Sequence, residues 1–120
     1  MEKTHNNVVL EKSIKFALRI VKLYRYLTEQ KHEYVLSKQL LLSGTFIAKH
    51  VRAAVLGESR QVFSSEMFAA MKRADETEFW LMIIHEGEFL QEKEYDSINT
   101  DCVELIKLTT SIAKTTRENE

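Results

Sequence analysis

A run of seven evenly spaced positions constrains this chain more than any other feature of its sequence. Between residues 63 and 84, small or apolar side chains recur alternately four and three residues apart. The positions are Phe63, Met67, Ala70, Ala74, Thr77, Leu81 and Ile84. This spacing puts all seven side chains on one face of an α-helix, whereas a strand would distribute them over both of its faces. The pattern predicts one long amphipathic helix over residues 59–86.

Three further segments show the same spacing, so we expect four helices, over residues 11–30, 34–56, 59–86 and 97–117. The chain contains no proline and three glycines, which disfavours the many turns of an all-β fold. Short connections between amphipathic helices favour antiparallel neighbours. The prediction is an all-α protein, an antiparallel up-and-down four-helix bundle that forms a single domain over residues 1–120.

Glycine and serine positions predict details of the helix ends. Gly44 lies inside the second helical pattern, where either close approach of a neighbouring helix or a local kink would explain it. Gly57 is expected to adopt a left-handed conformation just after this helix, and Ser59 to cap the next one. Gly87 is expected to end the third helix, and residues 87–95 to form an acidic connection.

The first predicted helix carries two apolar seams, whereas a helix buried in its own bundle needs one. One seam comprises Leu10, Ile14, Ala17, Val21 and Tyr24, and the other comprises Phe16, Ile20, Leu23 and Leu27. Together they cover about half of the helix circumference, and a bundle helix needs a stripe only a little over ~100° wide. The surplus predicts self-association or docking of a partner. We take the second seam as the candidate subunit interface on this helix.

Charge is divided unevenly between the two halves of the chain. Residues 1–60 contain 11 Lys and Arg against 5 Asp and Glu, and residues 61–120 contain 6 against 13. Five of these cations form a basic stripe on the first helix: Lys12, Lys15, Arg19 and Lys22 share one face, and Arg25 lies at its edge. Neighbouring like charges each cost a few tenths of a kcal/mol. Either acidic residues of the third and fourth helices or a nucleic-acid phosphate backbone would offset this repulsion.

Catalytic chemistry has no recognisable signature in the sequence. Glycine-rich phosphate loops, paired-cysteine motifs and metalloprotease motifs are all missing. The four histidines lie in separate predicted segments, Glu76 is expected to pair with Lys72, and Cys102 is expected to be a core residue. We therefore expect no enzyme activity, no cofactor and no metal site. The first residues lack the apolar run of a signal peptide and no stretch could span a bilayer, so we expect a cytoplasmic protein without membrane contact.

The region that contains the second and third predicted helices resembles a known family. The resemblance is carried by the stretch LSKQLLLSGTFIAKHVRAAVLGESRQVF and by ADETEFWL, and it extends over about residues 16–113. The family is that of the bacterial four-helix bundle proteins, which includes proteins encoded in intervening sequences of 23S ribosomal RNA genes. The resemblance implies a bundle without catalytic activity that assembles into a ring, a pentamer. A relative of this fold, the accessory variability protein of diversity-generating retroelements, works with a reverse transcriptase and RNA, so the resemblance also implies RNA association.

One face of the second helix departs from the family. Members often carry Arg at the position of Leu42, Ser at that of Phe46 and Glu at that of Ala53, so a face that is polar in relatives is apolar here. Leu42 and Phe46 therefore join the candidates for a subunit interface, where burying each side chain is worth roughly 1.5–3 kcal/mol.

Two functional hypotheses result. The first is a ring-forming, RNA-associated homo-oligomer whose basic stripe contacts RNA or a nucleic-acid-handling protein. The second is a protein-interaction scaffold that binds no nucleic acid, in which acidic helices neutralise the stripe.

Overall fold

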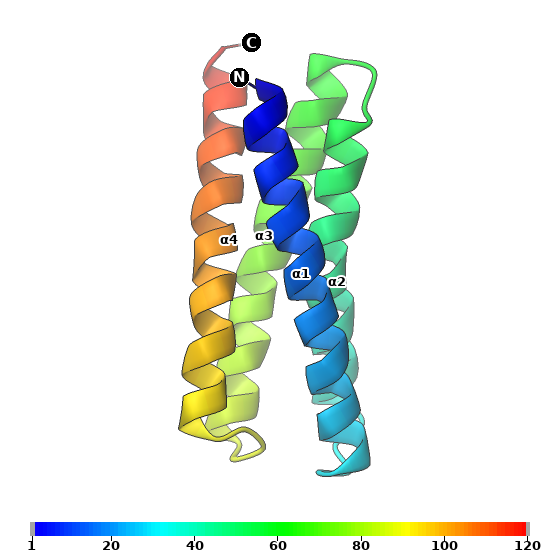
Figure 1. Cartoon of the computed structure of the whole chain (residues 1–120), viewed down its shortest axis with the longest axis vertical. Helices are drawn as coiled ribbons and strands as arrows, with labels where there is room; N and C mark the ends of the chain where they lie inside the picture. Colours follow the sequence, from blue (N-terminus) through cyan, green and yellow to red (C-terminus); the bar gives the residue numbers. More distant parts are fainter. Residues whose placement is uncertain (1, 120) are drawn as a thin grey trace.

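The computed structural model describes residues 2–119, and these residues form four α-helices. The helices are α1 (Glu2–Glu29), α2 (Leu36–Val55), α3 (Arg60–Glu86) and α4 (Glu92–Glu118). Successive helices are antiparallel, and α1 begins at the end of the bundle where α4 finishes (Figure 1). Each helix packs against two neighbours, in the order α1, α2, α3, α4 around the bundle, and α4 closes against α1. The predicted all-α antiparallel four-helix bundle is confirmed.

Two helices begin earlier than their apolar spacing indicates. The first starts at Glu2 instead of residue 11, and Val9 in its added turns is fully buried. The fourth starts at Glu92 instead of residue 97, so part of the expected acidic connection is helical. Its first turn contains Glu92 and Glu94, and carboxylates there are stabilised by the positive end of the helix dipole. The acidic residues at positions 92 and 94 therefore belong to the start of a helix and not to the connection that their composition predicts.

The expected helix ends are partly correct. Ser59 caps α3 as expected, because its side-chain oxygen accepts a hydrogen bond of 3.1 Å from the Val62 backbone N–H. Gly87 ends α3, and its N–H donates to the Ile83 carbonyl at 2.8 Å. The left-handed conformation expected for Gly57 was wrong, since none of the glycines in the described chain has a positive φ. Instead the Gly57 N–H closes a tight last turn by donating to the Ala54 carbonyl at 3.1 Å.

Glu33 organises the connection between α1 and α2. Its carboxylate accepts hydrogen bonds from the backbone N–H groups of Val35, Leu36 and Ser37, at 3.0, 2.9 and 2.6 Å. The Ser37 hydroxyl donates in return to the Glu33 carbonyl at 2.8 Å. These N–H groups at the start of α2 have no partner inside the helix, so Glu33 caps the N-terminus of α2.

One apolar core runs along the bundle axis. It contains the predicted 4-3 positions of α3 from Met67 to Ile84, whereas Phe63 is only partly buried against it. The fully buried large side chains include Phe16 and Ile20 of α1, Leu40 and Ile47 of α2, Met67 and Leu81 of α3, and Leu105 of α4. Two buried threonines, Thr77 and Thr109, each donate to the carbonyl four residues earlier at 2.7 Å. This local bond satisfies the hydroxyl, so a polar side chain can occupy a core position.

Gly44 marks a close approach between α1 and α2. A Cβ atom at this position would lie 2.7 and 2.9 Å from the Cγ1 and Cγ2 atoms of Ile20. The α2 helix runs without interruption through Gly44. Of the two explanations for this glycine, close approach of a neighbouring helix is therefore the one that the structure supports.

Candidate functional site

The cations of the basic stripe of α1 point in two directions, some toward α4 and some outward. On the side that faces α4, the Lys12 ammonium lies 2.8 Å from the Glu104 carboxylate. The Arg19 guanidinium lies 2.7 Å from the Asp101 carboxylate and also donates to the Ser97 hydroxyl at 3.0 Å. Acidic residues of the same chain therefore offset part of the repulsion along the stripe.

The remaining cations of the stripe point outward. Lys15 has only a long contact of 3.7 Å with Glu11 on its own helix, and both side chains are largely exposed. Lys22 and Arg25 are exposed and form no ion pair with any residue that the structure describes. Three of the five predicted nucleic-acid-binding residues are thus accessible to an anionic partner, and two are held by α4.

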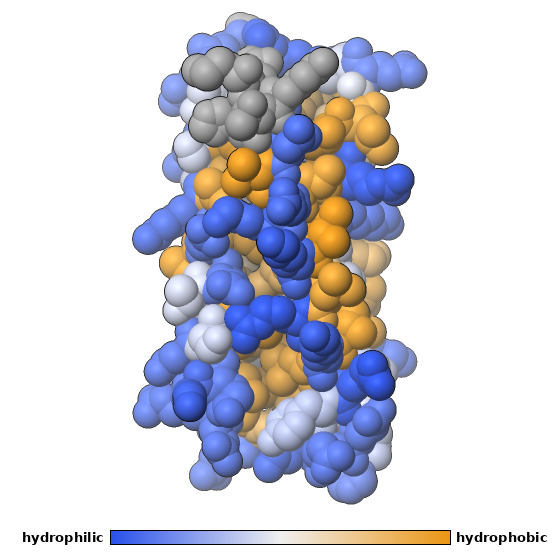
Figure 2. Space-filling model, viewed as in Figure 1, coloured by the Kyte–Doolittle hydropathy of each residue, from blue (hydrophilic) through white to orange (hydrophobic). Residues whose placement is uncertain are grey.

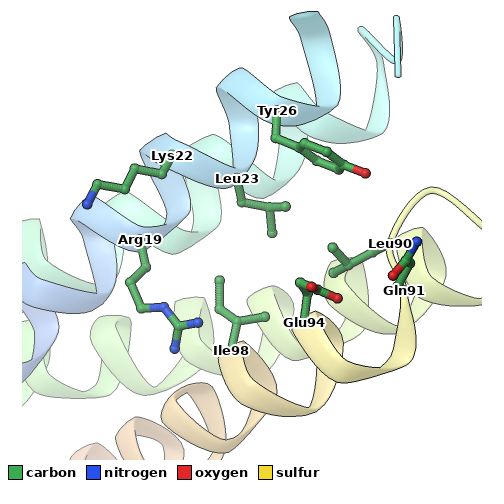
Figure 3. A pocket seen from close by; sticks show the side chains of 8 residues that line it. All are labelled: Arg19, Lys22, Leu23, Tyr26, Leu90, Gln91, Glu94 and Ile98. Carbon is green, nitrogen blue, oxygen red and sulfur yellow. The ribbon is translucent and has the colours of Figure 1, made fainter. Parts of the chain in front are cut away.

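A groove of about 520 Å³ separates α1 from the start of α4. Its apolar floor consists of Leu23 from α1, Ile98 from α4 and Leu90 from the preceding connection (Figure 3). Arg19 reaches toward α4 at one end of the groove, whereas Lys22 extends away from it (Figure 3). The helices diverge toward the end of α1 (Figure 1), and Arg19, which pairs with Asp101 of α4, is the first residue of α1 that lines the groove.

The charge asymmetry of the sequence becomes an asymmetry between opposite sides of the bundle. Helix α1 carries six Lys and Arg against three Asp and Glu, and α2 carries three against none. Helix α3 carries three Lys and Arg against five Asp and Glu, and α4 carries four Lys and Arg against six Asp and Glu. Because α1 and α2 are adjacent, as are α3 and α4, one side is basic and the other acidic. On the face in Figure 2, hydrophilic residues follow α1 down the middle and hydrophobic residues lie on both sides.

The subunit-interface candidates on α1 need correction. Phe16, Ile20 and Leu27 are at most 2% exposed because they fill the core of their own bundle. They cannot contact another subunit without unfolding this one. Leu23 is half-buried and lines the α1–α4 groove. The two seams were identified correctly, but their roles were exchanged, since the partly exposed one contains Ile14.

Two outer seams carry exposed apolar side chains that the sequence analysis did not propose as interface residues. The outer seam of α1 comprises Ile14, Leu18, Val21 and Arg25, and the outer seam of α3 comprises Asp75, Phe79, Met82 and Glu86. Leu18 is 58% exposed and Phe79 is 50% exposed. Both seams follow a 4-3-4 spacing, which was the signal in the sequence that could have identified them.

The face of α2 that departs from the family is exposed at one candidate residue and half-buried at the other. Leu42 is exposed, as an interface candidate should be, whereas Phe46 is half-buried against α3. The Lys49 ammonium lies 4.3 Å from the centre of the Phe46 ring, and the Arg73 guanidinium carbon lies 4.8 Å from it. Such cation–π contacts are worth about 0.5–1 kcal/mol at exposed sites. Phe46 therefore already has intramolecular partners.

The fold raises the pKa of two titratable groups, Cys102 and Tyr95. Cys102 is fully buried, and burial together with the nearby Glu78 and Asp75 raises the pKa of its thiol to about 12. His85 stacks on Tyr95 with ring centres 4.2 Å apart, and burial raises the pKa of that phenol. Among the described side chains, those of residues 6–119, acidic, histidine and cysteine residues form no group suited to holding a metal ion.

Two further expectations concern ion pairs and membranes. Glu76 contacts Arg73 at 3.3 Å, three residues away, instead of the expected Lys72.

The helices of the described chain lack the combination of length and apolar character that a bilayer-spanning segment needs.

Comparisons with known proteins place this bundle among relatives. The family described as 23S rRNA-intervening sequence protein matches residues 5–111. The chain is also similar to a crystal structure of a protein with unknown function from the S23 ribosomal protein family of Bacteroides thetaiotaomicron VPI-5482. The TM-score is 0.89 at 44% sequence identity, over 92% of this chain and 98% of that one. None of the curated proteins matches.

Proposed function

The chain belongs to the 23S rRNA-intervening sequence protein family, and we propose that it acts as a non-catalytic homo-oligomer that closes into a ring, a pentamer. The observation that carries this proposal is the apolar surface left on the outside of α1. Ile14 and Leu18 are 44% and 58% exposed although their helix already buries Phe16, Ile20 and Leu27 in its own core. Leaving large apolar groups in water forgoes about 25 cal/mol for each Å² that a partner could cover.

The mass of the particle in solution tests this proposal. A subunit has a mass of 14.0 kDa, so light scattering coupled to gel filtration separates a monomer from any ring. We expect one discrete assembly at micromolar concentration. A strictly monomeric species at tens of micromolar would overturn the proposal of self-association.

RNA association is the second part of the proposal, and it is favoured by the outward cations of α1. Lys15, Lys22 and Arg25 leave a row of positive charge that is only weakly compensated. In an assembly this row would recur once per subunit, so that a polyanion could bridge several copies and gain from their combined affinity. The family description names 23S rRNA, although it does not say that its members bind this RNA.

A protein-interaction scaffold without nucleic-acid binding remains the alternative. The pairing of Lys12 with Glu104 and of Arg19 with Asp101 favours it, because these charges are already neutralised within the chain. Filter binding with structured RNA separates the two proposals. Binding that weakens steeply with salt supports RNA association, and no binding at low salt leaves the scaffold.

We also propose a cytoplasmic location. Cys102 is unpaired and buried, as is usual for proteins in a reducing compartment.

A further inference from the structure

We infer that the outer seam of α3 binds a cationic amphipathic helix of a different protein. The seam comprises Asp75, Phe79, Met82 and Glu86 and lies on the acidic side of the bundle. This inference goes beyond the proposed self-association and RNA association, because it assigns a partner to a surface that neither of them uses.

Two large apolar side chains lie at the centre of this seam and face solvent. Phe79 and Met82 are 50% and 41% exposed. The Phe79 ring packs edge to face against the Trp80 ring, with ring centres 5.1 Å apart. Aromatic residues and methionine are enriched at protein interfaces. The 4-3-4 spacing of the seam fits a row of similar spacing on another helix.

The charges around this seam are mostly negative. Residues 74–92 contain six carboxylates and no Lys or Arg: Asp75, Glu76, Glu78, Glu86, Glu88 and Glu92. Within the described residues, Glu76 is the member of this set that forms an ion pair, with Arg73. Lys72 lies on the same face one turn before Asp75, and Lys93 follows on α4. Carboxylates outnumber the neighbouring cations, so a cationic partner is complementary to the seam.

Carboxylates of α3 and α4 converge beside the seam, at Tyr95. Burial raises the pKa of the Tyr95 phenol, and the negative charges of Glu78, Asp96 and Glu86 raise it further. These three carboxylates therefore lie close enough together to act on one point. Such like charges repel one another, and a cationic helix on the adjacent seam would offset this repulsion.

A second copy of the chain is a poorer occupant of the seam. The apolar row on α1 has Glu11 at one end and Arg25 at the other, so its two ends carry opposite charges. Lys15 and Lys22 lie toward α4, away from this row. Helix α2 has three Lys and Arg and no carboxylate, but Leu42 is the one large apolar side chain exposed within its bounds. A helix with an apolar row and cations on both flanks matches the seam better than either surface.

The two sides of the bundle would then serve different ligands. Lys15 and Lys22 of α1 are available to an anionic ligand, whereas the seam of α3 receives a cationic protein segment. The seam extends over about three helical turns, so the contact is smaller than the ~800 Å² per partner of stable interfaces. The complex should therefore be transient.

Binding of a synthetic peptide tests this inference. The probe is a labelled peptide of about five helical turns, with leucines in a 4-3 row and lysines on both flanks. One control peptide has glutamates in place of the lysines, and another has the same composition with its leucines distributed around the helix. Fluorescence anisotropy at low salt should show binding of the probe to the unmodified chain and roughly tenfold weaker binding of both controls.

Two double variants locate the binding surface on the chain. F79S/M82S removes the apolar centre of the seam and should raise the dissociation constant of the probe roughly tenfold to a hundredfold. D75N/E86Q removes the charges at its ends, so it should weaken binding severalfold at low salt and much less at high salt.

Matched control variants make the same kinds of change elsewhere. L42S/L56S replaces two exposed apolar side chains, and E29Q/E118Q replaces two exposed carboxylates. Both controls should bind the probe like the unmodified chain.

Three results would overturn the inference. They are no binding of the probe, equal binding of the peptide with distributed leucines, and unchanged binding by both seam variants. If the unmodified chain assembles and F79S/M82S makes it monomeric, a second copy covers the seam and the inference is also wrong. RNA binding and the mass of the unmodified chain are measured separately, so failure of either proposed function is distinguishable from failure of this one.

Discussion

Arg19 of α1 and Asp101 of α4 lie 2.7 Å apart and join two helices that are distant in the sequence. The same guanidinium donates to the Ser97 hydroxyl at 3.0 Å, so one side chain connects α1 to two consecutive turns of α4. Lys12 and Glu104 repeat this arrangement nearer the start of α1. Polar contacts therefore supplement apolar packing between α1 and α4.

Replacing Asp101 with Asn should destabilise the bundle slightly. Both partners are more than one-third exposed, and exposed pairs contribute only about 0.2–1 kcal/mol. We expect a loss of this size in the free energy of unfolding, measured by urea titration at low salt. The loss should shrink in ~1 M salt, where charges are screened over about 3 Å. The control D96N removes a charge from the same helix without an ion pair, and an equal effect there would contradict a specific role for Asp101.

Substituting Gly44 with Ala should reveal the contact with Ile20. The added methyl group gains about 1 kcal/mol of helix propensity but meets side-chain atoms 2.7 and 2.9 Å away. Overpacking of this kind costs about 1–3 kcal/mol, so G44A should be neutral to destabilising. In the I20A background the clash is removed, and the same substitution should stabilise the protein. A double-mutant cycle of thermal unfolding measures this change of sign, and additive effects would refute the contact.

Stability should depend on pH through Glu33. Burial acts to raise the pKa of this carboxyl, but hydrogen bonds from Leu36, Ser37 and Val35 outweigh it and hold the pKa below the ordinary 4.5. A carboxyl with a lowered pKa stabilises the fold above pH 4.5, and this stabilisation is lost as the pH falls toward the folded-state pKa.

The variant E33Q isolates this contribution. At neutral pH it should lose about 1–2 kcal/mol, as expected for a damaged helix cap. Below the lowered pKa of the folded state, Glu33 is itself protonated, so the unfolding curves of the two proteins should converge there. The exposed Glu29 serves as control through E29Q, whose small effect should show no such convergence. A constant difference between E33Q and the unmodified chain at all pH values would be evidence against the assignment.

The sequence allowed the architecture to be predicted because 4-3 spacing reports which side chains face a core. The positions from Met67 to Ile84 appear in the structure as predicted. Spacing could not tell which of two seams on α1 faces the core, because both consist of apolar residues. That choice depends on which seam faces Gly44 of α2, where the missing side chain leaves room for a neighbour. The side chain of Ile20 occupies this room. The pairing of Arg19 with Asp101 depends on how α1 and α4 are aligned along the bundle, and no local pattern encodes that alignment.

Cys102 should be inert toward thiol reagents in the folded protein. Its sulfur is fully buried, donates to the Ala74 carbonyl at 3.5 Å, and has a pKa raised to about 12 by burial. Since the thiolate is the reactive form, labelling with a chromogenic disulfide should proceed only as fast as the helices open. The same reagent should react at once in denaturant, which provides the control. Rapid labelling of the native chain would contradict the burial of Cys102.

RNA binding should depend on Lys15 and Lys22 more than on cations elsewhere. Each contact with a phosphate adds about one unit to the slope of log affinity against log salt. The double variant K15Q/K22Q should therefore lower that slope by about two and weaken binding at low salt roughly tenfold. The matched control K107Q/K114Q removes the same charge from the exposed surface of α4 and should retain most of the binding. Equal losses in both variants would indicate that net charge, and not this face of α1, attracts the RNA.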